Sequence, residues 1–176
     1  METLIQVCFP SRLAHNLLSR THWLCLSTGN ILLCRKKDGS PQLGLIDYGQ
    51  TKSLTKEARH LFCKIIIALD EDNKEEIVKL VREAGYRSEK MDPECMYLYA
   101  RVGYDQDSRK LTGGKHIQMF MEELNARDPI EQFPTDYLMV ARTSVLLRGL
   151  AHVLHQRRSV AKIWRPIAER VLKEDI

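Results

Sequence analysis

The 176-residue sequence lacks several features that would assign it to a specialised class of protein. No apolar run approaches the roughly 20 residues that a membrane-spanning helix needs. There is no C-x-x-C pair, no internal repeat and no low-complexity tract. The five cysteines are odd in number, which favours free thiols in a reducing compartment over a disulfide framework. The net charge of +4 is small, so we predict no nucleic-acid partner.

The composition that remains is that of an ordinary globular protein. Apolar residues make up 44% of the chain and charged residues 28%. A chain of this length is long enough to bury a substantial core and corresponds to one domain by the usual prior.

Two short apolar segments separated by a polar turn predict a β-hairpin over Gly29–Asp47. Asn30 opens the first segment, and Asp47, followed by an aromatic residue and a glycine, closes the second. Asp38-Gly39 lies at the centre of the turn. Asn30 and Asp47 offer amide and carboxylate oxygens, which are ligands that a hard cation such as Mg²⁺ accepts. The competing interpretation is that Asp47 belongs to a simple turn.

Beyond Gly49 the apolar residues follow a helical period, and we expect no extended sheet after Thr55. The helix starts rest on capping residues: Thr55, Asn73 and Asp92-Pro93, while Gly85 is a stop signal. The expected helices are Thr55–Leu69, Asn73–Ala84, Glu94–Arg101, Lys115–Arg127, Thr135–Leu154, and a last helix from Ser159 that Pro166 interrupts.

Two further expectations concern the C-terminal half. The polar stretch Gly103–Gly114, with its two adjacent glycines, is predicted to be a loop. The helix from Thr135 has a wide apolar face and few charges, so we expect it to lie in the centre of the core. That apolar face comprises Leu138, Val140, Ala141, Val145, Leu146, Leu150 and Val153.

Three segments in order carry a resemblance to a known family. The first is Gly29-Asn30-Ile31-Leu32-Leu33 followed by Gly44-Leu45-Ile46-Asp47-Tyr48-Gly49. The second is Phe133-Pro134-Thr135-Asp136, then Arg142 and Arg148-Gly149-Leu150-Ala151, and the third is Trp164-Arg165-Pro166 with Ala168. The chain resembles the UbiB-type atypical kinases, also called AarF-domain kinases, from about Gly29 to Leu172. In that family the first segment typically reads H-x-D-P-H-P-G-N-[IV]-L, followed by G-L-I-D-[FYH]-G.

The resemblance implies a mainly α fold with one β-hairpin, the C-terminal lobe of a protein kinase-like fold. It divides the chain into an unmatched, ill-ordered lead-in at 1–26 and a lobe at 27–176. It implies that Asn30 and Asp47 hold Mg²⁺ and thereby ATP or ADP. The family is associated with isoprenoid-quinone (ubiquinone) biosynthesis and lipid homeostasis, so the resemblance implies a mitochondrial or plastid location.

The departure from the family pattern is equally specific. Counting back from Asn30, the family's catalytic Asp falls on Cys25, and we predict no catalytic residue in this chain. The smaller lobe, with its phosphate-binding Lys and K-x-G-Q segment, is expected to be absent, so nucleotide binding should be weak. An alternative start, a retained intron and a gene-model error all remain open as origins. The alternative function is a non-catalytic helical interaction module that takes a protein partner at the exposed hairpin face.

The remaining candidate sites have simpler interpretations. His152 and His155 are spaced for one helix face, but no further ligand accompanies them. The basic residues Arg157, Arg158, Lys162 and Arg165 are interpreted as a solvated face. A nucleophilic role for Cys25 lacks a base in a suitable context. Residues 1–26 are interpreted as a short irregular or helical lead-in, with a weak transit peptide as the alternative.

Overall fold

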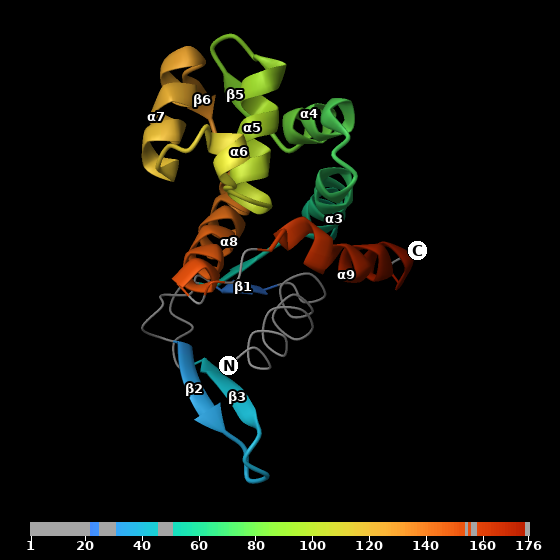
Figure 1. The fold of residues 1–176 in the computed structure, drawn as a ribbon. Helices are drawn as coiled ribbons and strands as arrows, with labels where there is room; N and C mark the ends of the chain where they lie inside the picture. The colour runs from blue at the N-terminus through green and yellow to red at the C-terminus, as the bar shows by residue number, and fades with distance from the viewer. Residues whose placement is uncertain (1–21, 25–30, 46–50, 154, 156–157, 175–176) are drawn as a thin grey trace.

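The computed structural model describes residues 22–24, 31–45, 51–153, 155 and 158–174 (Figure 1). The described part is mainly helical, with small two-stranded antiparallel sheets, as the sequence predicts for the class. The strands are β1 (His22–Leu24), β2 (Ile31–Arg35), β3 (Pro41–Leu45), β4 (Thr51–Ser53), β5 (Arg87–Ser88) and β6 (Ile130–Gln132). The helices are α3 (Lys56–Asp70), α4 (Lys74–Glu83), α5 (Pro93–Tyr104), α6 (Arg109–Thr112), α7 (Ile117–Arg127), α8 (Thr135–Val153) and α9 (Val160–Glu174).

The predicted hairpin is formed by β2 and β3, with Ile31 paired to Leu45 at its open end. At the turn, Asp38 Oδ1 accepts a hydrogen bond from the Ser40 amide at 2.9 Å. Gly39 adopts a φ of +79°, a conformation that glycine tolerates and that short hairpin loops use. The predicted turn with Asp38-Gly39 at its centre is therefore confirmed.

Local capping sets the starts of the first helices. The side chains of Thr55, Asn73 and Asp92 each accept a hydrogen bond from a backbone N–H of the turn that follows. At the end of α4, Gly85 has a φ of +96°, and its N–H and that of Tyr86 return to carbonyls of the last turn. This is the glycine-dependent helix stop that the sequence predicts. The bounds of α3, α4 and α8 match the expected ranges within one residue.

The loop predicted for Gly103–Gly114 is wrong in part. Helix α5 continues to Tyr104, and α6 forms a single turn over Arg109–Thr112. Ser108 caps that turn by accepting a hydrogen bond from the Leu111 N–H, a local bond that needs no hydrophobic period. Helix α7 begins at Ile117 rather than Lys115, because His116 occupies the capping position.

The expectation of a single hairpin is wrong, and the only sheet among the described residues after Thr55 is one short pair of strands. His22–Leu24 in the lead-in forms β1 and pairs with β4. The other residues of the segment 1–26 lie outside the described residues. Strands β5 and β6 pair across Ser88 and Ile130. These strands hold two or three residues each, too few for an alternating pattern to be visible in the sequence.

Helix α9 runs unbroken through Pro166, where the sequence predicted an interruption. Its buried stripe continues on both sides of the proline, from Trp164 to Ile167 and Ala168. Pro166 itself is exposed, so packing of that stripe against the domain holds the helix together.

Phe62 on α3 is the centre of the core. Its ring contacts Tyr104 of α5 at 5.3 Å, Tyr137 of α8 at 5.6 Å and Trp164 of α9 at 6.5 Å between centroids. All four side chains are buried. Aromatic pairs at these distances stabilise beyond the area they bury, so α3, α5, α8 and α9 are joined at one point.

Helix α8 is central, but its buried face differs from the prediction. Val140 is fully buried, whereas Leu138 is 51% exposed. The polar residues Thr143, Ser144 and Arg148 are buried instead. Thr143 returns its hydroxyl to the carbonyl of Met139 at 2.9 Å, which removes much of the cost of burying it.

The arrangement of the elements has two ends (Figure 1). Helices α4 to α7 with β5 and β6 gather at one end, and the β2–β3 hairpin lies at the other. Helix α8 runs between them, and α9 lies beside α3. None of the helices in the described part combines the length and apolar character that a membrane crossing requires.

Candidate functional site

The predicted metal ligands Asn30 and Asp47 lie outside the described residues, as does Cys25. The described hairpin nevertheless constrains the chain around them. Asn30 directly precedes Ile31, Asp47 follows Leu45 by two residues, and Ile31 and Leu45 are paired. The described residues that adjoin the two predicted ligands in the sequence are therefore paired at one end of the hairpin.

The oxygen donors of Asn30 and Asp47 are of the type that a hard cation prefers, but two residues are too few to complete its coordination. Mg²⁺ prefers oxygen ligands and is usually held by one or two protein groups together with substrate phosphates. Within the described ranges, no group of three or more His, Cys, Asp or Glu side chains is placed to hold a metal ion. Asn30 and Asp47 would thus hold Mg²⁺ only together with the phosphates of a nucleotide, where the ion would neutralise phosphate charge.

Arg148, in the second family-like segment, links two helices. It is 6% exposed. Its Nη2 donates to the Val102 carbonyl of α5, and its Nε donates to the Ser144 carbonyl at 3.3 Å. Charge-assisted bonds to backbone carbonyls are stronger than neutral ones, so Arg148 fastens α8 to α5.

The third family-like segment joins α9 to α3. Trp164 is buried against Phe62. Arg165 donates from Nη1 to Asp70 at 3.0 Å, from Nη2 to Glu71 at 2.8 Å, and from Nε to Glu169 at 2.8 Å. The hydrogen bond from Arg165 to Glu169, and to a smaller extent the one to Asp70, raise the pKa of this guanidinium above its ordinary value. Arg165 is thus a docking residue of α9.

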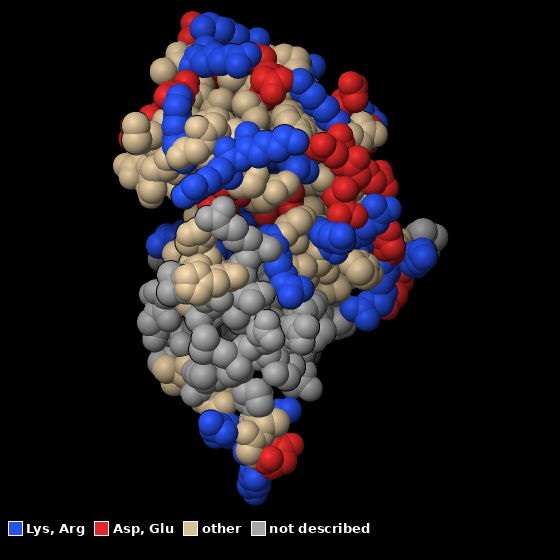
Figure 2. Space-filling view, in the orientation of Figure 1, with Lys and Arg blue, Asp and Glu red and all other residues tan. Residues whose placement is uncertain are grey.

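Of the basic residues predicted to form a solvated face, the prediction holds for Arg158 and Lys162 and is wrong for Arg165. His152 and His155 are exposed, and no described metal-binding group includes them. Of the basic run, Arg158 and Lys162 are exposed, Arg165 is paired with three carboxylates, and Arg157 lies outside the described residues. Figure 2 shows Lys and Arg interspersed with Asp and Glu on the face in view, without one continuous basic surface.

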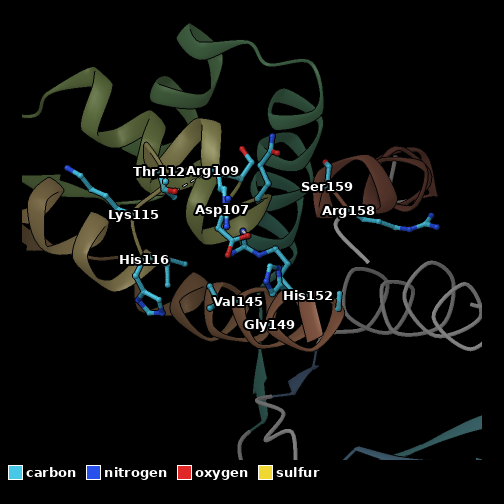
Figure 3. Close-up of a pocket in the computed structure, with 16 residues that line it drawn as sticks. Asp107, Arg109, Thr112, Lys115, His116, Val145, Gly149, His152, Arg158 and Ser159 are labelled. Carbon is cyan, nitrogen blue, oxygen red and sulfur yellow. Dashed lines mark hydrogen bonds and ion pairs between the residues drawn. The ribbon is translucent and has the colours of Figure 1, made fainter. Parts of the chain in front are cut away.

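A cavity of about 630 Å³ lies between the chain around α6 and the C-terminal half of α8 (Figure 3). Polar walls come from the segments before and after α6, and an apolar wall comes from Val145, Ile117 and Ala151. Asp107 and His152 point into this space, whereas Lys115 and Arg158 extend away from its centre. Lys115 is also paired with Glu123 at 2.6 Å. A volume of this size is typical of small-molecule sites.

Arg148, which borders this cavity, has one guanidinium nitrogen that is buried within the protein. Its Nη1 is buried and has no hydrogen-bond partner among the described residues. The nearest acid is Asp107, whose Oδ1 lies 3.9 Å from Nη1, beyond hydrogen-bond distance. Burial lowers the pKa of the Arg148 guanidinium, and the charges of Asp107 and Asp105 offset this only in part. An arginine still keeps its charge at neutral pH.

No pattern in the sequence indicates this cavity. Its walls come from the segments 106–117 and 145–159, which are distant in the chain, and no local motif marks Asp107 or Thr112. One signal was available in the sequence: Arg148 lies in the largely apolar second half of α8. An arginine buried in a helix needs hydrogen-bond or charged partners.

Comparisons of the chain with protein-family models, curated proteins and solved structures returned no match. The three family-like segments therefore support a family proposal on their own residues alone.

Proposed function

We propose that this chain is the C-terminal-lobe portion of a UbiB-type (AarF-domain) atypical kinase, and that it is catalytically incompetent alone. The observation that carries the proposal is the pairing of Ile31 with Leu45. Asn30 precedes Ile31 directly and Asp47 follows Leu45 by two residues in the sequence, so this pairing supports the proposal that the two share a cation. Mg²⁺ held there would contact the phosphates of ATP or ADP.

The C-terminal segments support the same proposal. Arg148 and Trp164 are buried, and Arg165 is bonded to α3. In each of these two segments, therefore, the residues that resemble the family fasten helices together. Such roles explain why the segments would persist in a lobe whose catalytic residues have been replaced. The family's link to isoprenoid-quinone and lipid metabolism in mitochondria or plastids enters as part of this proposal.

The expected chemistry is limited to weak nucleotide binding. Phosphoryl transfer needs the nucleotide held in line and its charge neutralised by several groups. Cys25 stands where the family has its catalytic Asp, and this sequence contains no K-x-G-Q segment. We expect no detectable ATP hydrolysis, and a Kd for Mg-ATP no tighter than about millimolar, which corresponds to roughly 4 kcal/mol of binding energy.

The test uses Mn²⁺ as a paramagnetic substitute for Mg²⁺ in the presence of ATP, observed by NMR. Selective broadening of the Ile31 and Leu45 amides is expected in the unmodified chain. Asp47→Asn should abolish it, whereas Asp38→Asn, at the far turn of the same hairpin, should not. Broadening that survives Asp47→Asn would reject the site. A micromolar Kd that Asp47→Asn abolishes would instead reject the claim of weak binding.

Turnover separates the catalytic claim from the binding claim. Cys25→Asp alone should not produce ATP hydrolysis, because the groups that clamp the phosphates are still missing. Measurable hydrolysis by this variant, with none by the unmodified chain, would show that only the residue at position 25 prevents catalysis.

A non-catalytic interaction module is the second candidate, and one feature of the hairpin favours it. Leu32 is 42% exposed and Cys34 is exposed, and the two lie two residues apart on β2. Residues at this spacing share one face of a strand. An apolar hairpin face of this kind fits a protein partner.

A further inference from the structure

We propose that strand β2 pairs edge to edge with β2 of a second copy of this chain, antiparallel and centred on Leu33, so that the two hairpins form one four-stranded sheet. This pairing rests on the second candidate function, the interaction module, and gives its hairpin a specific partner. It involves neither Asn30 nor Asp47, so its failure would leave the proposed nucleotide site unaffected.

The outer edge of β2 carries unpaired backbone groups. Strands β2 and β3 form a sheet of their own, and neither pairs with a third strand among the described residues. Across the turn, the Lys36 N–H donates to the Ser40 carbonyl at 2.8 Å, which makes these two residues a hydrogen-bonded pair. Hydrogen-bonded and non-hydrogen-bonded pairs alternate along an antiparallel ladder, so Cys34–Gln42 is the next hydrogen-bonded pair. The intervening residues 31, 33 and 35 therefore direct their N–H and C=O groups away from β3.

The two outer edges of the hairpin differ in how well they accept another strand. Pro41 of β3 belongs to a non-hydrogen-bonded pair, so its nitrogen faces the outer edge of β3 and has no hydrogen to donate. Gly44 weakens the same strand further. Strand β2 reads Ile-Leu-Leu-Cys-Arg, with neither proline nor glycine. Open apolar edges pair with other strands, whereas a proline on the edge opposes pairing, so β2 offers the favourable edge.

The length of β2 selects one register for a pair of copies. Centred on Leu33, an antiparallel pair matches all 5 residues of the strand, and Ile31 lies opposite the partner's Arg35. The outward groups of residues 31, 33 and 35 then form about six hydrogen bonds between the copies, whereas a register centred on Leu32 or Cys34 forms about four. The two-fold arrangement closes on itself, so it gives a dimer and not a fibre.

The charges of the hairpin favour the same arrangement. Arg35, Lys36 and Lys37 are exposed at the turn, and residues 31–34 carry no charge. An antiparallel pair places the two cationic turns at opposite ends of the sheet, whereas a parallel pair would bring them together. The uncharged edge offers no ion pair to a charged peptide, but it matches a second uncharged copy of itself.

The pairing also brings exposed apolar side chains together. Leu32 is 42% exposed and Cys34 is exposed, and both lie on one face of β2. In the register centred on Leu33, Leu32 lies opposite the partner's Cys34 in a non-hydrogen-bonded pair, where the side chains of two strands are closest. Four side chains, two from each copy, thus form one apolar stripe and remove part of their surface from water.

Disulfide trapping tests the register. Leu32→Cys places a thiol opposite the partner's Cys34, at about 4.5 Å between Cα atoms, within the range that a disulfide spans. With oxidised glutathione as the oxidant, this variant should form a disulfide-linked dimer, and peptide mass spectrometry should find the link between positions 32 and 34. In the unmodified chain the two Cys34 residues are diagonal neighbours, at roughly 7–8 Å, and should link far less.

The control for random collision is Leu138→Cys, since Leu138 is 51% exposed but lies on α8. It should give no dimer enriched in a link between positions 138 and 34. Links that favour position 34 with itself, or equal linking in the control, would overturn the proposal.

Proline substitution tests the edge. Leu33→Pro removes an N–H that points away from β3, so the hairpin keeps its own hydrogen bonds while two bonds between the copies are lost. Sedimentation velocity should show a dimer Kd raised by about tenfold or more. Leu43→Pro is the matched control, because Leu43 pairs with Leu33 and its N–H faces the outer edge of β3. It should leave the dimer Kd nearly unchanged.

Equal effects of the two prolines, or no effect of Leu33→Pro, would overturn the proposal. Should Leu33→Pro unfold the hairpin, as NMR of the Gly39 and Ser40 amides would show, the links formed by Leu32→Cys still decide. A chain that stays monomeric while its hairpin binds a different protein would overturn the pairing and leave the interaction module standing.

Discussion

Arg165 of α9 donates a hydrogen bond to Asp70 at the end of α3, with 3.0 Å between Nη1 and Oδ2, although the two residues are 95 positions apart. The same guanidinium also reaches Glu71 and Glu169. One side chain thus links the last described helix to the first one after the hairpin. The guanidinium can serve three carboxylates at once because its three nitrogens carry donors that point in different, fixed directions.

Arg165→Gln should therefore lower the melting temperature by about 2–4 °C, a shift expected for a modest loss of stability in a domain of this size. Arg165→Lys should recover only part of the loss, because one ammonium cannot reach all three acids. The measurement is thermal unfolding by circular dichroism at low and high salt, and salt should reduce the difference. Arg170→Gln is the control, since its ion pair with Glu174 is exposed and 3.9 Å long. An equal effect in the control would reject the docking role of Arg165.

Asp128 should make stability depend on acid pH. It is fully buried and accepts hydrogen bonds from Ser88 Oγ at 2.7 Å and from the amides of Lys90 and Asp92. Burial raises the pKa of this carboxyl, but the hydrogen bonds outweigh it and the pKa falls below its ordinary value. The carboxylate therefore stabilises the folded state above about pH 4, the unfolded pKa, and this contribution is lost as the pH falls through the folded pKa.

Asp128→Asn should cost about 1–3 kcal/mol of unfolding free energy at pH 7, because the amide cannot accept all three bonds. The measurement is urea unfolding from pH 7 down to pH 3. The difference from the unmodified chain should narrow as the pH falls below about 4, because the unfolded Asp128 carboxyl takes up a proton there while the folded one has a lower pKa. Glu131→Gln, exposed on the neighbouring β6, should have no comparable effect. A difference that stays constant over this range would contradict the assignment.

Pro166→Ala should stabilise the protein, since the ring nitrogen of Pro166 cannot donate to the carbonyl of Lys162 within α9. The gain should be about 2 kcal/mol, which is the roughly 3 kcal/mol helical cost of proline less up to about 1 kcal/mol for the greater entropy of the unfolded alanine chain. Chemical denaturation measures it, with Lys173→Ala on the same helix as the control. A loss of stability would indicate that the proline shapes a bend that packing needs.

Leu32→Glu should reduce self-association of the isolated chain. Leu32 is 42% exposed on the hairpin, and exposed apolar surfaces promote association. We expect the unmodified chain to be partly oligomeric at micromolar concentration, and sedimentation velocity measures the shift toward monomer. Leu138→Glu is the matched control, because Leu138 is similarly exposed but lies on α8. A monodisperse, cooperatively unfolding monomer in the unmodified chain would contradict the expectation.

The sequence by itself determined the features that depend on neighbouring residues. Thr55, Asn73 and Asp92 marked helix starts because a cap is a bond between residues two or three positions apart. Gly85 and Asp38-Gly39 marked a stop and a turn because the backbone there needs residues that tolerate unusual φ or local side-chain bonds. The candidate ligands Asn30 and Asp47 were likewise identified from the sequence. That their described neighbours Ile31 and Leu45 are paired is known only from the β2–β3 register.

The tertiary structure decided what depends on residues far apart in the chain. The β5–β6 pair is stabilised by Asp128, whose carboxylate accepts hydrogen bonds from the backbone amides of Lys90 and Asp92. These partners are 38 and 36 positions away in the chain. Helix α9 continues through Pro166 because its buried stripe packs on both sides of the proline. Arg148 is buried while Leu138 is exposed because α5 supplies the arginine with an acceptor. The energies of such long-range contacts exceed local preferences, and no window of neighbouring residues contains them.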